Sequence, residues 1–371
     1  MVTAILKRSF IKRNDFSLLG LEGAVIKMRN IVKKFKTTVG DVTVLKGIDT
    51  AFFPGEFVGV IGKSGSGKST LVNMLTGIDR PTSGEVQIGE TLVHQLSESQ
   101  MARWRGLNLG IVFQFYQLLP VLTLLENTML PMDIADKIPR SEREKRALSL
   151  LKMVGLENAA EKMPAAVSGG QQQAAAVARA MANDPPFIIA DEPTGNLDSR
   201  TAENIFQIFE GLVQRGKTII MVTHDPNLAQ RTTRTLLLCD GEVIHPAVAA
   251  ALPWLTHTQM LRATHTCQIK TYQPGASIIQ QGQPVEQLFI ISRGGVEVRP
   301  ENAGKTVRLN PGKVFGLVSL LSNKPASASV VAAGEDQPVE LLALEQKTFC
   351  ELISESSALR QALLAGGEVL V

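Results

Sequence analysis

Gly62-Lys63-Ser64-Gly65-Ser66-Gly67-Lys68-Ser69-Thr70 decides the fold, because it fits the phosphate-loop pattern G-x-x-x-x-G-K-[ST]. An apolar run at residues 57–61 precedes it and predicts a buried strand, while residues 71–75 predict the start of a helix. In that context, consecutive backbone N–H groups at a helix N-terminus can hold a phosphate chain. We expect Lys68 to contact the β- and γ-phosphates and Ser69 to ligate Mg²⁺. The expected nucleotide-binding residues here are Ser64, Gly65, Ser66, Gly67, Lys68, Ser69 and Thr70.

Length and composition exclude several classes of protein. A chain of 371 residues predicts two domains, and a formal net charge of +3 is too small to favour nucleic acid as the partner. Cys239, Cys267 and Cys350 are far apart and form no C-x-x-C pair, which indicates a reducing compartment without a disulfide or zinc frame. No apolar stretch reaches about 18 residues, so we expect no segment that spans a membrane alone.

Strands alternate with helices between residues 24 and 245, a pattern that predicts a layered α/β domain. Residues 218–222 form an apolar run typical of a buried strand. Residues 141–154 predict a helix that begins with a capping box, in which Ser141 and Glu144 satisfy the first free N–H groups.

The pattern changes near residue 245. Residues 246–254 are rich in Ala and Pro and predict a linker. Residues 255–371 consist of short strands separated by Gly and Pro turns, which predicts a small β-barrel or roll, and residues 348–364 predict a closing helix. At the other end, residues 1–23 form a basic extension, either an amphipathic helix on an anionic membrane or a surface terminus.

Two carboxylates follow an apolar run at residues 187–190. Asp191 ends the predicted strand, where it can hold Mg²⁺ directly or through water. Glu192 comes next and can polarise a water molecule for attack on a γ-phosphate, which makes it the candidate catalytic base.

Residues 167–173, Val-Ser-Gly-Gly-Gln-Gln-Gln, precede a predicted helix and are close to the L-S-G-G-Q signature. With these motifs, residues 24–245 resemble an ATP-binding-cassette (ABC) ATPase. The resemblance implies an α/β P-loop nucleotide-binding domain with a mixed sheet and a helical subdomain. It also implies that the signature binds the γ-phosphate of ATP held by another subunit. One phosphate loop and one signature per chain imply a dimer around two ATP, most simply a homodimer. The implied signature contacts are Ser168, Gly169, Gly170 and Gln171.

Further residues match the family's pattern. Gln114 matches the glutamine that contacts Mg²⁺ and the attacking water, and His224 matches the histidine that senses the γ-phosphate. Phe35 lies where the family places an aromatic ring on adenine, although it could equally be a core residue. Asp198 lies in the family's segment after the catalytic glutamate and is expected to contribute to nucleotide binding. Ala174 departs from the pattern, which has a basic residue there.

Residues 117–127 and 191–198 look like those of the macrolide-export, lipoprotein-release and cell-division subgroup. Members serve separate membrane subunits and transmit force across the membrane by ATP-driven closure. The resemblance therefore implies an ATPase subunit at the cytoplasmic face of the membrane, bound peripherally through a separately encoded membrane subunit. Two alternatives stay open: a soluble ABC ATPase acting on nucleic acid or ribosomes, and an ATP-dependent regulatory dimerisation module.

The C-terminal region, about residues 255–365, resembles a cyclic-nucleotide-binding domain. The matching stretches run from 272–275 to 288–298 and include 311–316. A binding member needs a glutamate for the ribose hydroxyl and an arginine for the cyclic phosphate. The corresponding residues are Leu317 and Ala326, so we expect no cyclic nucleotide to bind. The domain then serves dimerisation, docking or regulation by protein contact.

Overall fold

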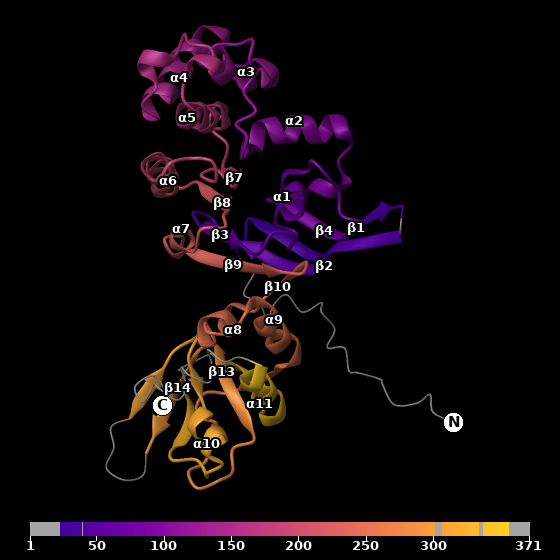
Figure 1. The fold of residues 1–371 in the computed structure, drawn as a ribbon, viewed down its shortest axis with the longest axis vertical. Coiled ribbons are helices and arrows are strands. Elements are labelled where there is room, and N and C mark those ends of the chain that lie inside the picture. Colours follow the sequence, from indigo (N-terminus) through magenta and orange to yellow (C-terminus); the bar gives the residue numbers. More distant parts are fainter. Residues whose placement is uncertain (1–22, 39, 301–305, 334–336, 356–371) are drawn as a thin grey trace. The chain divides into compact units, whose positions relative to one another are not determined.

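The structure, a computed structural model, describes residues 23–38, 40–300, 306–333 and 337–355. The chain divides into two compact units (Figure 1). Where described, the first comprises residues up to 59, 69–223 and 230–234, and the second comprises 60–68, 224–229 and the chain from 235 onward. The amphipathic extension considered for residues 1–23 lies almost wholly outside the described residues.

The phosphate-loop domain is built on two sheets. Four strands form an antiparallel sheet of order β2-β1-β4-β5, and six form a sheet of order β10-β9-β3-β8-β7-β6. The strands are β1 (Ile26–Thr37), β2 (Gly40–Phe52), β3 (Phe57–Ile61), β4 (Ser83–Ile88), β5 (Thr91–Leu92), β6 (Leu109–Val112), β7 (Phe187–Asp191), β8 (Thr218–Val222), β9 (Arg234–Cys239) and β10 (Glu242–Val243).

Three neighbouring strands, β6, β7 and β8, run parallel. Ile189 is aligned with Ile111 on one side and with Ile220 on the other. Because parallel strands end at the same edge of a sheet, Val112, Asp191 and Val222 close that edge together. Since β9 and β10 pair antiparallel, the sheet is mixed, as predicted.

Helices α3, α4 and α5 pack against one another and form the predicted helical subdomain (Figure 1). The helices of this part of the chain are α1 (Lys68–Thr76), α2 (Glu98–Asn108), α3 (Leu124–Ala135), α4 (Arg140–Met153), α5 (Gly169–Ala180), α6 (Ser199–Gln214) and α7 (Pro226–Gln230). Short 3-10 turns are η2 (Val93–Gln95), η3 (Glu157–Ala159) and η4 (Pro164–Ala166).

The capping box predicted at Ser141 is wrong. α4 begins one residue earlier, at Arg140, after Pro139, whose side chain makes no capping hydrogen bond. Proline suits a helix start because its φ is fixed near the helical value. Reciprocal capping boxes instead begin α2, α3 and α5.

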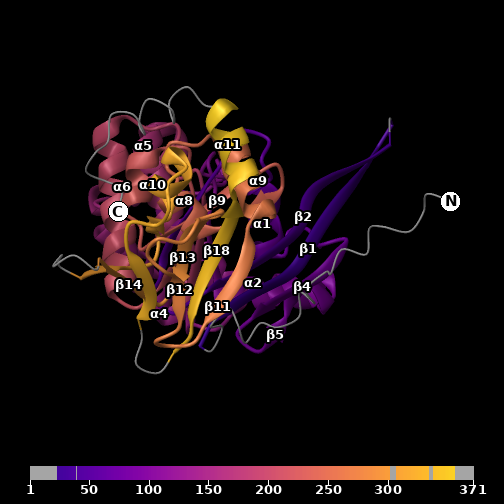
Figure 2. The same cartoon turned by 90° about the horizontal axis from the view of Figure 1, so that it is seen from below.

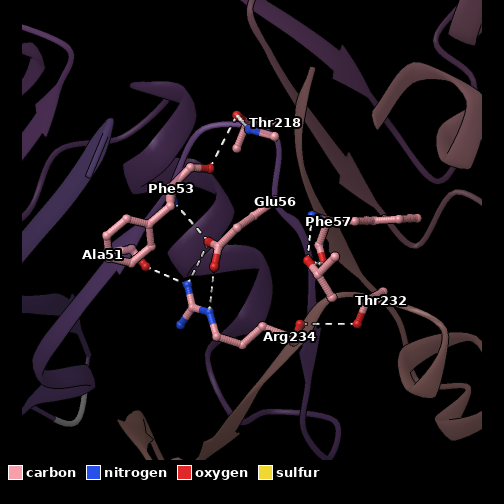
Figure 3. A network of polar contacts seen from close by, with 9 residues as sticks. Ala51, Phe53, Glu56, Phe57, Thr218, Thr232 and Arg234 are labelled. Atoms are coloured by element: carbon pink, nitrogen blue, oxygen red, sulfur yellow. Dashed lines mark hydrogen bonds and ion pairs between the residues drawn. The ribbon is translucent and has the colours of Figure 1, made fainter. Parts of the chain in front are cut away.

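The start of β3 is held by aromatic packing and by a polar network. Phe57 stacks on Phe206 of α6 with ring centroids 5.1 Å apart. Glu56 Oε2 accepts hydrogen bonds from Phe53 N (2.9 Å) and from Arg234 Nη2 (3.1 Å), and the same Arg234 nitrogen donates to Ala51 O (2.6 Å) (Figure 3). The network thus joins β2, the turn before β3 and the start of β9.

The C-terminal region forms two antiparallel sheets, of order β11-β18-β13-β16 and β12-β17-β14-β15, which confirms the predicted β-roll (Figure 2). Its elements are α8 (Pro246–Ala251), α9 (His257–Thr266), β11 (Gln268–Tyr272), β12 (Ser277–Ile279), β13 (Gln287–Arg293), β14 (Gly295–Arg299), β15 (Val307–Leu309), β16 (Val314–Phe315), α10 (Leu317–Ser322), β17 (Ser329–Ala333), β18 (Val339–Glu345) and α11 (Gln346–Glu355). The predicted closing helix corresponds to α11 as far as residue 355.

The stretch expected to be a linker is helical and packed. In α8, Ala247, Val248 and Ala251 are buried. They belong to a core that also contains Cys239 and Ile244, from the end of β9 and just after β10. Further members of this core come from α9, α10, α11 and the strands β13 and β18.

Replacing Arg234 by Leu tests the network before β3. We expect a loss of roughly 1–3 kcal/mol of unfolding free energy, because the partly buried Glu56 carboxylate loses a charged partner. The measurement is urea unfolding in a Trp254→Phe background, where Trp104 fluorescence reports on the first unit. As a control, Glu98→Gln removes the charge from the exposed pair with Arg80 in the same unit and should cost at most about 1 kcal/mol. Equal losses in both variants would contradict the assignment.

Candidate nucleotide-binding site

The phosphate loop connects β3 to α1 and folds around the Lys68 ammonium. Lys68 Nζ donates hydrogen bonds to Gly62 O (2.8 Å) and Lys63 O (3.0 Å), and the side chain is buried. Gly65 and Gly67 have φ values of +79° and +100°, which side chains rarely adopt. The loop therefore has the glycine-dependent backbone that a phosphate cradle requires.

The turn after β9 holds this loop from one side. Ser66 O accepts a hydrogen bond from Gly241 N (3.0 Å), and a Cβ at Gly62 would lie 2.3 Å from Leu238 O. Ser66 Oγ is buried and has no hydrogen-bond partner among the described residues. The exposed Ser64 and Ser69 leave backbone and hydroxyl groups open to solvent. A polyphosphate fits this donor set: a lysine ammonium, an unsatisfied hydroxyl and glycine N–H groups.

A second group of site residues gathers at the edge where β6 and β7 end. Gln114, two residues after β6, donates from Nε2 to Glu192 Oε2 at 3.2 Å. Asp191 is the last residue of β7 and aligns with Val222 of β8. The structure thus brings together the predicted base, the predicted water-positioning amide and the predicted metal ligand.

Glu192 is held in an unusual backbone conformation. Its φ is +46°, its N donates to Val222 O at 3.0 Å, and its O accepts from Gly195 N at 3.1 Å. A Cβ at Gly195 would lie 3.4 Å from Glu192 Oε2 and 3.5 Å from Gln114 Nε2. A left-handed conformation at a non-glycine residue is costly and is typical of functional sites. The backbone therefore fixes the point from which the Glu192 side chain projects toward Gln114.

The signature residues form the N-terminus of α5. Ser168 caps the helix: its Oγ accepts from Gln171 N (3.3 Å), and Gln171 Oε1 accepts from Ser168 N (3.0 Å). Both glycines are tightly packed. An added Cβ would lie 2.7 Å from Tyr116 Oη at Gly169 and 2.3 Å from Thr201 Cγ2 at Gly170.

Asp198 caps α6 through its carboxylate. Oδ1 accepts from Arg200 N (3.1 Å) and Thr201 N (3.0 Å), and Oδ2 accepts from the Thr201 hydroxyl (2.6 Å). The Thr201 hydroxyl, followed by the backbone donors, lowers the pKa of Asp198 below its ordinary value. Since Thr201 also packs on Gly170, Asp198 and the signature are joined through one side chain.

Arg179 is a positioning residue that the sequence did not reveal. From the last turn of α5 it donates to Tyr116 O (2.7 Å) and Gln117 O (2.5 Å), and its burial lowers the pKa of the guanidinium. Tyr116 and Gln117 both have positive φ values. Gln173 Nε2, also on α5, reaches Phe113 O at 3.4 Å. The signature helix therefore holds the loop that carries Gln114.

The remaining predicted residues are placed individually. Phe35 lies on β1 with its ring exposed and Lys33 Nζ 4.9 Å from its centre, so it is not a core residue. His224 is exposed and follows β8 by two residues. Ala174 is buried on α5 beside Ala175 and Ala176, where a basic side chain would lose its hydration.

Comparison with known proteins agrees with this geometry. Residues 45–195 match the family model described as "ABC transporter", and residues 269–356 match the model "Cyclic nucleotide-binding domain". The uncharacterized ABC transporter ATP-binding protein YvrO of Bacillus subtilis is 43% identical over 220 residues, which cover 59% of this chain and 96% of that protein. The lipoprotein-releasing system ATP-binding protein LolD of Bacteroides thetaiotaomicron is also 43% identical, covering 59% and 99%.

A solved structure has the same fold. The chain superposes on the ATP-binding cassette MJ0796, described as a dimeric post-hydrolysis state bound to ADP and Pi, with a TM-score of 0.56 and 43% identity. That match covers 59% of this chain and 96% of the other. MJ0796 is from Methanocaldococcus jannaschii, and its sequence is 45% identical over 223 residues, 59% of this chain and 95% of that protein.

Replacing Glu192 by Gln tests the catalytic base. We expect ATP turnover to fall at least about 100-fold, because an amide cannot accept the proton of the attacking water. The measurement is steady-state phosphate release. Glu142→Gln, an exposed site on α4, serves as the control and should keep wild-type turnover. Wild-type turnover in Glu192→Gln would show that this carboxylate is not the base.

Replacing Gly170 by Ala tests the close packing under the signature. We expect a loss of about 1–3 kcal/mol in stability, because the new Cβ meets Thr201 Cγ2. Thr201→Ser removes that methyl group and keeps the hydroxyl bonded to Asp198, so the double variant should recover most of the loss. Denaturant unfolding of Gly170→Ala and of the double variant measures the loss of stability and its recovery. An absence of recovery would show that another contact excludes the side chain.

Proposed function

Since the chain belongs to the ABC transporter ATP-binding family, we propose that it is the ATPase subunit of a membrane transporter or force-transmitting complex. The observation that carries this proposal is the hydrogen bond between Gln114 and Glu192, beside Asp191 at the end of β7. We propose a cassette domain at residues 24–245 and a β-roll domain at 255–371, with 246–254 between them.

Each residue then has a chemical task. Glu192 accepts a proton from the attacking water, and Gln114 orients that carboxylate through its amide. Lys68 and the loop N–H groups bind the phosphates, while Ser69 and Asp191, with Gln114, supply oxygen ligands for Mg²⁺. Mg²⁺, when bound, neutralises charge that develops on the phosphates. His224 and Phe35 are assigned to the γ-phosphate and the adenine on the strength of the family pattern.

We propose that two such chains form the working unit. The signature lies at the N-terminus of α5, a helix of 12 residues, where Ser168 and Gln171 are exposed. A helix N-terminus favours an anion, so it can receive the γ-phosphate of a partner's ATP. The similar protein MJ0796 has been solved as a dimer, which supports this arrangement.

The membrane partner is proposed to dock beside the loop that carries Gln114. Phe115 and Val121 are 72% and 77% exposed, and Ile134 on α3 is also largely exposed. Exposed large apolar side chains are candidates for contact with a partner. Among the described residues, no helix is long and apolar enough to cross a bilayer. On the strength of the similar lipoprotein-releasing system ATP-binding proteins, we propose that a separately encoded integral membrane subunit holds this chain at the cytoplasmic face.

We also propose that the C-terminal domain does not bind a cyclic nucleotide. Leu317 and Ala326, at the positions expected to bind ribose and phosphate, are both buried, and Lys324 is exposed. A buried cyclic phosphate without a cation would carry a large desolvation cost.

Co-purification tests the proposed function. Tagged Glu192→Gln protein is isolated with ATP from detergent-solubilised native membranes, and an integral membrane protein is expected at equal stoichiometry. A Phe115→Asp/Val121→Asp variant should lose that partner and keep its basal ATPase activity. Val42→Asp, at an exposed apolar site on β2, should keep both. If only soluble protein or nucleic acid co-purifies, the membrane assignment is wrong. A wild-type chain that binds ATP without turnover would instead be a regulatory dimerisation module.

A further inference from the structure

The β-roll has an open cavity of about 380 Å³, lined by strands of both of its sheets and by α10. Strands β12, β14, β15, β16 and β17 contribute to the wall, together with α10 and the loop before β17. Residues that define the cavity are Ile279, Val298, Phe315, Val318, Ala326 and Val330. Pockets of this size bury a small molecule, so the cavity is a candidate binding site.

The chemistry of the lining is apolar. None of the described lining residues carries a charge, and their polar side chains are the hydroxyls of Ser319 and Ser327. Arg308, on β15, and Lys324, in the loop after α10, do not line the cavity. An anionic ligand would therefore lose its hydration without gaining a cation as partner. An uncharged apolar ligand has no charge to dehydrate and avoids this free-energy cost.

Contacts among its own residues hold the wall in shape. Phe315 stacks on Phe289 with ring centroids 5.1 Å apart and the planes at 11°. Ala326 is fixed on both sides, since its N donates to Gln283 O (2.8 Å) and its O accepts from Gly282 N (2.9 Å). β-Branched side chains such as Val298 and Val330 have few rotamers and resist collapse into the space. The cavity is thus preformed.

We propose that this cavity binds an uncharged, predominantly apolar small molecule in place of a cyclic nucleotide. The inference goes beyond the proposed ATPase function and is independent of it. The two serine hydroxyls can orient one polar group of the ligand, while the rest is recognised by shape and apolar contact.

α10 gives the bound molecule a path to the rest of its unit. Val318 and Ser319 face the cavity, whereas Leu317 and Leu320 of the same helix are buried in the core that contains Cys239 and Ile244. Gly241 lies in the turn between Cys239 and Ile244, and its N donates a hydrogen bond to Ser66 O of the phosphate loop. A ligand that shifts α10 therefore acts on a core continuous with the site of the phosphates.

The test uses the full chain and the uncharged fluorophore N-phenyl-1-naphthylamine as the probe. We expect a saturable rise in probe fluorescence with a Kd of about 1–10 μM, and no displacement by cyclic AMP or cyclic GMP. Val318→Phe, which fills the cavity from α10, should weaken probe binding at least about tenfold.

A matched control lies on the same helix. Leu321 is 45% exposed, close to the 46% of Val318, but it does not line the cavity. Leu321→Phe should leave probe binding within about twofold of wild type. If Val318→Phe unfolds the roll, Val307→Phe fills the cavity from a half-exposed position on β15. Non-saturable binding, equal effects of Phe at 318 and 321, or displacement by a cyclic nucleotide would each overturn the proposal.

Discussion

The parallel alignment of β6, β7 and β8 is the constraint on which the candidate site depends. Because the three strands point the same way, the chain emerges from each of them at one edge of the sheet. Gln114 and Glu192 lie 78 residues apart in sequence and meet there through a single hydrogen bond. Had one of these strands run antiparallel, its following loop would lie at the opposite edge and the pair could not form.

Close packing at a glycine and hydrogen bonds from polar side chains position the segments around these strand ends. Gly170 lets α5 approach Thr201, where an added Cβ would lie 2.3 Å from Thr201 Cγ2. Arg179 then fixes the backbone of the loop that follows Gln114. The signature helix and the loop that carries Gln114 are therefore joined by direct hydrogen bonds. These bonds give a physical route from the proposed dimer contact to the carboxylate of Glu192.

Much of this architecture could be predicted from sequence, because local motifs carry it. The phosphate loop, the carboxylates at the end of β7 and the signature are each contiguous in sequence. Their chemistry can therefore be inferred before the fold is known. The contacts of Arg179 were not predictable, since an arginine in the last turn of a helix is ordinary and its acceptors are backbone carbonyls 62 and 63 residues away. The cavity was also not predictable, because its lining comes from six separate elements and the loops between them. The composition of residues 246–254, rich in Ala and Pro, predicts a linker, yet most of the stretch forms α8 and is packed.

The packing of α8 determines how this chain can be divided. Cys239 and Ile244 belong by sequence to the last strands of the cassette, but their side chains lie in the core completed by α8 and the roll. A chain cut after β10 would expose these apolar side chains to water, so the end of the cassette depends on α8 and the roll for its burial. The roll and the end of the cassette thus share one hydrophobic core, and the roll cannot be exchanged as an independent module.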